Sequence, residues 1–95
     1  MSEKEAYQEK LDAQLQQWST KVDELKAKAD QANTETQLEY YEQIEELRFK
    51  QAAAYAKLQE LRDTEERSWR ELKPGLEHAL DNFKSSVEKA VAKLR

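Results

Sequence analysis

The chain has 95 residues, of which 16 are Lys or Arg and 20 are Asp or Glu, and it contains one Gly, one Pro and no Cys. Ala, Glu, Lys, Leu and Arg together contribute 54 residues, a bias typical of long helices and coiled coils, so this composition excludes sheets. Without Cys, a disulfide framework and thiolate chemistry are excluded. This fits a reducing compartment, and we expect a cytoplasmic protein.

The net charge of −4 is small and acidic, which opposes binding to a nucleic-acid backbone. No stripe of Lys and Arg interleaved with aromatic residues overrides it, so we expect no nucleic-acid partner. The first ten residues, MSEKEAYQEK, contain no apolar run, and the sequence predicts neither a signal peptide nor a membrane span. A short chain with few large apolar residues buries only a thin core, so we expect self-association.

A heptad pattern runs through most of the chain. Apolar residues follow alternating steps of four and three from Leu11 to Thr36, which is the spacing of a coiled-coil seam. Two successive steps of four, ending at Tyr40 and Ile44, form a stutter, after which the pattern resumes. The sequence therefore predicts an oligomer seam made of Leu11, Leu15, Trp18, Val22, Leu25, Ile44, Leu47, Leu58, Leu61 and Leu72.

The favoured interpretation of this pattern is one long coiled-coil helix over residues 1–73. Neither Pro nor Gly occurs between Ser2 and Lys73, so both strong breakers of helical structure are missing from this stretch. An unbroken helix from Ser2 to Lys73 would be about 105 Å long at 1.5 Å per residue. Such a rod suits a scaffold or spacer.

The alternative is a turn near residues 33–35. Helix propensity drops there, and Thr34 with Gln37 has the spacing of a capping box. Folding back at this point would place Val22 near Ile44 and join two halves of the seam within one chain.

A kink or a reversal is predicted at Pro74 and Gly75, because Pro removes a backbone donor and clashes with the preceding turn. Residues 74–95 then form a C-terminal amphipathic helix. Its contact stripe consists of Leu76, Leu80, Phe83, Val87, Val91 and Leu94. If this helix folds back, four residues of the stripe, Leu80, Phe83, Val87 and Val91, should pack near Leu58, Leu61, Glu65 and Ser68.

The C-terminal helix also carries Lys84, Lys89 and Lys93 beside its apolar stripe. Helices that lie on anionic lipid have basic residues in the same place. Glu77 and Asp81 dilute this basic character. A bundle helix is therefore favoured, and a membrane surface is the less favoured partner.

Residues suited to catalysis or to metal binding are scarce. His78 is the only histidine, so zinc protease and two-iron bundle templates cannot be built in one copy of the chain. An acidic window without basic residues is better explained as a solvated helix face than as a calcium site, which needs a looped ligand set; it consists of Glu35, Glu39, Glu42, Glu45 and Glu46. We expect no enzyme, no cofactor and no metal.

Three aromatic residues fall off the predicted seam: Tyr41, Phe49 and Tyr55. They form a candidate face for a partner, either another copy or another protein. Gln51 occupies a seam position where an apolar side chain is expected, and such polar positions can specify register and partner.

The segments SWRELKPGLEHALDNFKSSVEKA (68–90) and EYYEQIEELRFKQ (39–51) resemble a group of small bacterial coiled-coil proteins of the stress-response type. The residues that carry the shared pattern are Trp69, Leu72, Lys73, Gly75, Ala79 and Leu80. The resemblance implies a bacterial, helical protein associated with stress, and it implies no catalytic residue.

These observations predict an all-α protein whose long amphipathic helices form a homo-oligomeric coiled coil or helical bundle. The expected function is that of a non-enzymatic structural or adaptor protein that acts through helix–helix contacts. The alternative is a surface-active helical protein that opens its thin bundle and binds membranes or exposed apolar surfaces of stressed proteins.

Overall fold

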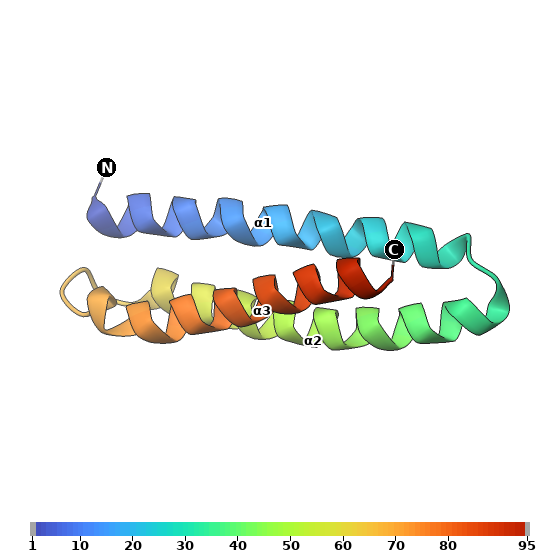
Figure 1. Ribbon diagram of the computed structural model, residues 1–95. Helices are drawn as coiled ribbons and strands as arrows, with labels where there is room; N and C mark the ends of the chain where they lie inside the picture. Colours follow the sequence, from blue (N-terminus) through green and yellow to red (C-terminus); the bar gives the residue numbers. More distant parts are fainter. Residues whose placement is uncertain (1, 95) are drawn as a thin grey trace.

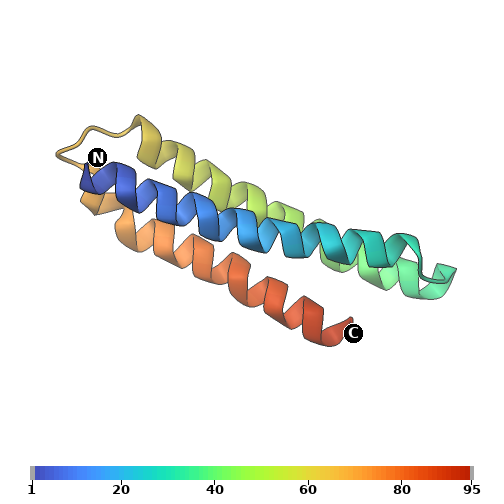
Figure 2. The same cartoon turned by 90° about the horizontal axis from the view of Figure 1, so that it is seen from above.

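The computed structural model describes residues 2–94. Residue 1 of the predicted range 1–73 and residue 95 of the predicted range 74–95 therefore lie outside the described residues. The described residues form α1 (Glu3–Asp30), α2 (Thr34–Asp63), the short 3-10 helix η1 (Trp69–Leu72) and α3 (Lys73–Lys93). They contain no strand, and the all-α prediction is confirmed. Consecutive α-helices run in opposite directions and lie side by side in a bundle of 52 × 20 × 19 Å (Figures 1 and 2).

The predicted single helix over residues 1–73 is wrong, because the chain reverses direction at residues 31–33. Asn33 caps the new helix: its side-chain oxygen accepts a hydrogen bond from the backbone N–H of Thr36 at 3.0 Å. Asn is among the best N-cap residues because it satisfies a donor that the first helical turn leaves unpaired. The alternative turn is therefore present, but α2 starts at Thr34 itself, and the cap lies one residue earlier than the expected capping box.

The register between α1 and α2 also differs from the expected one. Arg48 donates from Nη2 to the Asp23 carboxylate at 2.9 Å and links the two helices. The fold-back interpretation paired Val22 with Ile44. The contact of Asp23 with Arg48 instead shifts α2 along α1 by about one helical turn relative to that expectation. The three-residue turn and the polar contacts together determine the register that the apolar spacing left open.

The second reversal occurs at residues 64–68 and not at Pro74–Gly75, so the predicted break at that dipeptide is wrong. Pro74 lies in the first turn of α3, where backbone N–H groups lack intrahelical acceptors in any case. Pro therefore begins this helix and does not interrupt it. The Lys4 ammonium donates to the Thr64 carbonyl at the C-terminal end of α2, where the helix dipole favours a cation.

The C-terminal helix folds back along α2 and reaches further than predicted. The buried hydroxyl of Tyr40 donates to the carbonyl of Leu94, so the end of α3 lies beside the first half of α2. Glu65 and Ser68, two of its expected neighbours, lie in the connection and are exposed.

One apolar core runs through the bundle and receives a stripe from every α-helix. Each residue of the predicted oligomer seam and of the predicted C-terminal stripe is buried in this core or packs against it. The seam therefore closes within one chain. The least exposed large side chains are Phe83, Leu47, Leu58, Leu61, Leu76, Val22 and Val87.

The two phenylalanines provide a matched test of this core. Phe83 is fully buried, whereas Phe49 is 77% exposed. We expect Phe83→Ala to lower the free energy of unfolding by about 3–5 kcal/mol, because the substitution leaves a cavity. Phe49→Ala should change it by no more than about 0.5 kcal/mol. Urea denaturation followed by circular dichroism measures both, and equal losses would contradict the packing.

Candidate functional site

Large apolar side chains remain exposed only on α2 within residues 2–94. They are Leu38, Tyr41, Phe49 and Tyr55, with exposed fractions of 64%, 37%, 77% and 50%. Single exposed apolar residues are ordinary, but four on one helix of a small bundle make that helix the candidate contact element.

The outer stripe of α2 is the row of exposed residues that faces away from the core. Its members repeat at steps of four and three, the same spacing that the buried residues of α2 follow on the opposite side. We use the name outer stripe for Leu38, Glu42, Glu45, Phe49, Ala52 and Ala56.

The predicted partner face of Tyr41, Phe49 and Tyr55 is not one continuous surface. The Tyr41 hydroxyl donates to the Asp30 carboxylate at 2.7 Å, so this ring leans toward the end of α1. Tyr55 lines a groove between α1 and α2. Phe49 alone belongs to the outer stripe. Sequence reasoning missed Leu38, although it lies eleven residues, or three helical turns, before Phe49 and therefore on the same side.

The acidic residues of the outer stripe make no close ion pair within the part of the chain that the structure describes. Within residues 2–94, Glu42 and Glu45 have no ion-pair partner within 4.0 Å. Two carboxylates elsewhere on α2 do have one: Glu46 pairs with Lys50 at 3.5 Å, and Glu60 pairs with a lysine at the same distance. Their charge is thus available to a partner.

A shallow hollow of about 310 Å³ adjoins Phe49, between α2 and α3. Its walls include Ala53 and Ala79, and its lining is mostly apolar. The single histidine, His78, lies at this hollow and is exposed. The hollow extends the apolar surface around Phe49 toward α3.

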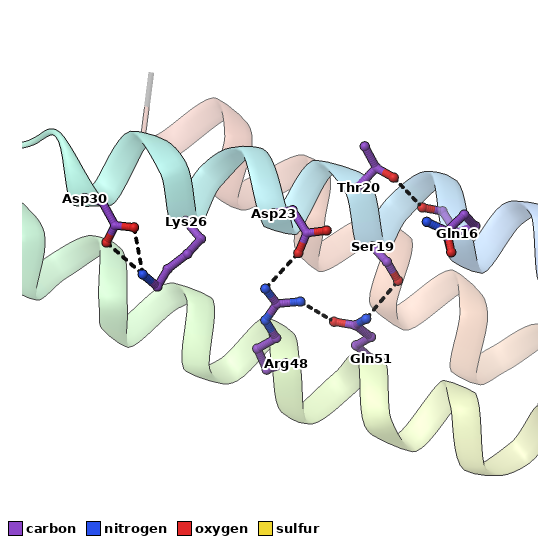
Figure 3. A network of polar contacts seen from close by, with 8 residues as sticks. All are labelled: Gln16, Ser19, Thr20, Asp23, Lys26, Asp30, Arg48 and Gln51. Atoms are coloured by element: carbon purple, nitrogen blue, oxygen red, sulfur yellow. Dashed lines mark hydrogen bonds and ion pairs between the residues drawn. The ribbon is translucent and has the colours of Figure 1, made fainter.

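The groove between α1 and α2 is larger, about 660 Å³, but most of its polar side chains already bond to each other. The Gln51 amide donates to the Ser19 hydroxyl at 2.9 Å and accepts from Arg48 Nη1 at 3.0 Å (Figure 3). Arg48 in turn bonds Asp23, as described above. The polar seam position at Gln51 therefore holds two helices of one chain in register.

The stripe of α3 that resembled a lipid-binding face lies inside the bundle. Phe83 and Val87 are both fully buried. The Lys84 ammonium lies 5.6 Å from the centre of the Trp18 ring on α1, a cation–π contact that closes the edge of this interface. Contact between this stripe and lipid would require α3 to leave the bundle.

The acidic window does not form a cluster suited to a cation. In the part of the chain that the structure describes, no group of three or more His, Asp or Glu side chains is arranged to hold a metal ion. The window lies on one straight helix, so its carboxylates spread along and around α2.

An aromatic cluster closes the end of the bundle where α1 begins. The rings of Tyr7 and Trp69 lie 5.4 Å apart between centroids, and the Lys73 ammonium lies 4.9 Å from each. The Tyr7 hydroxyl donates to Glu77 Oε1 at 3.0 Å. Burial, this hydrogen bond and the negative charge of Glu77 raise the pKa of Tyr7 to about 12. The cluster anchors η1 and α3 to α1.

Comparisons with protein-family models, curated proteins and solved structures found no match to this chain. The resemblance to bacterial stress-response coiled coils therefore stays a prediction from the sequence. Among residues 2–94, no helix has the length and apolar character needed to cross a membrane.

Because of the aromatic cluster, we expect the free energy of unfolding to fall at alkaline pH. The folded-state pKa of about 12 for Tyr7 exceeds its ordinary value of 10.0, so the fold favours the protonated phenol. This contribution is complete below pH 10 and is lost as the pH rises through about 12. Tyr7→Phe cannot ionise, so its free energy of unfolding should decline less across this window.

Urea denaturation at several pH values measures how steeply the free energy of unfolding falls with pH in the wild type and in Tyr7→Phe. Titration of tyrosinate absorbance should show that the substitution removes a phenol that ionises near pH 12. Identical slopes for the wild type and Tyr7→Phe would contradict the role of this hydroxyl.

Proposed function

We propose that the protein is a non-enzymatic adaptor whose outer stripe binds a basic amphipathic helix of another protein. The observation that carries this proposal is that Phe49 is 77% exposed. It lies in a row with Leu38 on the side of α2 that the bundle leaves uncovered. An aromatic residue at the centre of a surface that excludes water is the usual energetic anchor of a protein interface.

The outer stripe has the residue pattern of a helix-packing surface. Phe49 and Leu38 supply apolar knobs, and Ala52 with Ala56 lets another helix approach closely. The heptad spacing suits a partner that lies along α2 and presents residues at i, i+3, i+4 and i+7.

The charge of the stripe specifies the chemistry of the partner. Glu42 and Glu45 lie between the two apolar anchors, and neither makes an ion pair within residues 2–94. A partner helix with Lys or Arg opposite these positions gains complementary contacts, and an acidic helix meets repulsion. The partner is therefore basic on the same face that carries its apolar anchors.

The bundle supports this role mechanically. The inner side of α2 packs against both other helices, with Leu47, Leu58 and Leu61 nearly inaccessible to solvent. The outer stripe therefore belongs to a preformed, straight helix, which reduces the ordering cost of binding. The proposed link to stress, to bacteria and to the cytoplasm rests on the sequence expectations alone.

Calorimetry with a designed peptide tests the proposal. The probe is an amphipathic helical peptide with Leu at its heptad contact positions and Lys beside them. We expect Phe49→Ala to weaken binding about tenfold or more, because burying a Phe side chain is worth about 1.5–3 kcal/mol. Leu38→Ala should weaken binding in the same direction.

The matched control protein is Tyr55→Ala, which removes an exposed aromatic side chain from α2 outside the outer stripe. The matched control peptide carries Glu in place of every Lys and should bind more weakly. Equal binding of both peptides, or a Phe49→Ala protein that binds as well as the wild type, would contradict the proposal.

A further inference from the structure

The turn between α1 and α2 consists of residues that are compatible with a helix. Its sequence is Gln31, Ala32 and Asn33, without Gly or Pro, and no residue in 2–94 has a positive φ. Gln31 stays on the right-handed side of the backbone map, with φ −99° and ψ −6°. Asn33 has φ −71°, within the helical range, but its ψ of 164° is far from the helical value of about −42°. No steric feature of these side chains forces the chain to turn.

The apolar pattern continues through the turn without a change of phase. Leu25 and Ala29 precede the turn, Ala32 lies within it, and Thr36 and Tyr40 follow at steps of four. A helix that passed straight through residues 31–33 would keep these side chains on one face. The core residues of α1 and α2 would then line the same side of one continuous helix.

The turn also lies outside the part of the bundle that α3 covers. The C-terminal end of α3 stops beside Tyr40, short of the turn in both views (Figures 1 and 2). The second connection is anchored differently, because Trp69 is only 4% exposed and Lys4 bonds the Thr64 carbonyl. The first turn can therefore straighten while α2, η1 and α3 stay packed.

We infer that two copies of this chain exchange α1 by straightening this turn, forming an antiparallel dimer in which each α1 packs on the α2 of the other copy. An antiparallel pair of continuous helices preserves every α1–α2 pairing of the single chain, now between chains. The contacts of Asp23 with Arg48 and of Ser19 with Gln51 re-form with unchanged chemistry. The partner is a second copy, so this inference goes beyond the adaptor function.

The balance between the two forms depends mainly on concentration and on the turn itself. Both forms bury the same core, so the exchange gives up the Asn33 cap on Thr36 and gains the backbone hydrogen bonds of an uninterrupted helix. The continuous helix from Glu3 to Asp63 would measure about 90 Å, against 52 Å for the longest dimension of the single bundle.

Refolding from urea at high protein concentration, followed by size-exclusion chromatography with light scattering, should yield a species of twice the monomer mass of 11.2 kDa. Two double variants then show whether two packed helices come from the same chain or from different chains. Ser19→Cys with Gln51→Cys places thiols across the α1–α2 interface, and Lys50→Cys with Ser86→Cys places them across α2–α3.

The chain has no cysteine of its own, so a short bismaleimide reagent links only the introduced pairs. In the isolated dimer, the first pair should give covalent dimers on a denaturing gel, and the second should give monomers only. In the isolated monomer, both pairs should link within one chain. Small-angle scattering of the unlabelled wild-type dimer measures its length and does not depend on these variants.

Single variants test whether the turn controls the exchange. Asn33→Ala removes the cap and favours helix, so we expect the dimer dissociation constant to fall at least tenfold. Ser2→Ala removes the comparable N-cap of α1, which accepts from the Glu5 N–H, and should leave that constant unchanged.

Two outcomes would overturn the inference. One is the absence of any dimer in both the wild type and Asn33→Ala at high concentration. The other is a dimer whose Ser19→Cys, Gln51→Cys pair links within single chains. Such a dimer would associate through its surface, and its sensitivity to Phe49→Ala would show whether the outer stripe is involved.

Discussion

The fold depends on the fact that no α-helix can bury its inner apolar stripe alone. In a chain with 38% charged residues, all other sides of the helices remain in water. The stripes of α1, α2 and α3 therefore meet along a single axis, where Val22, Leu47 and Phe83 are almost completely inaccessible. The ends, the connections and the exposed surfaces are arranged around this closure, as in other thin helical bundles.

Heptad spacing predicted which side chains are buried, but it could not predict where the chain turns. A stripe keeps its phase whether the helix continues or folds back, so the spacing around Ala29 and Ala32 fits both arrangements. The cue that decides is the Asn33 cap, a weak signal in a single sequence. Pro74 misled the sequence interpretation for a related reason, because the cost of Pro depends on whether it falls in the interior or in the first turn of a helix.

The candidate site was predictable only in part. Phe49 falls off the seam, which correctly indicates exposure, but the directions of Tyr41 and Tyr55 depend on where α1 lies beside α2. That position follows from the register, which polar contacts such as Gln51 with Ser19 establish. Leu38 could have been found from the sequence, because it falls off the predicted seam and lies three helical turns before Phe49, but only aromatic residues were considered there.

The two proposed contacts use different sides of α2, and the exchange of α1 involves only the inner one. Straightening residues 31–33 changes the chain that supplies α1, while Leu38 and Phe49 keep their outward direction in both forms. An exchanged dimer therefore carries two outer stripes on one rigid particle. A partner with two basic helices would bind such a particle more tightly than a single bundle, because its second contact forms at a high effective concentration. The proposed self-association and the proposed partner binding would thus reinforce each other without sharing a surface.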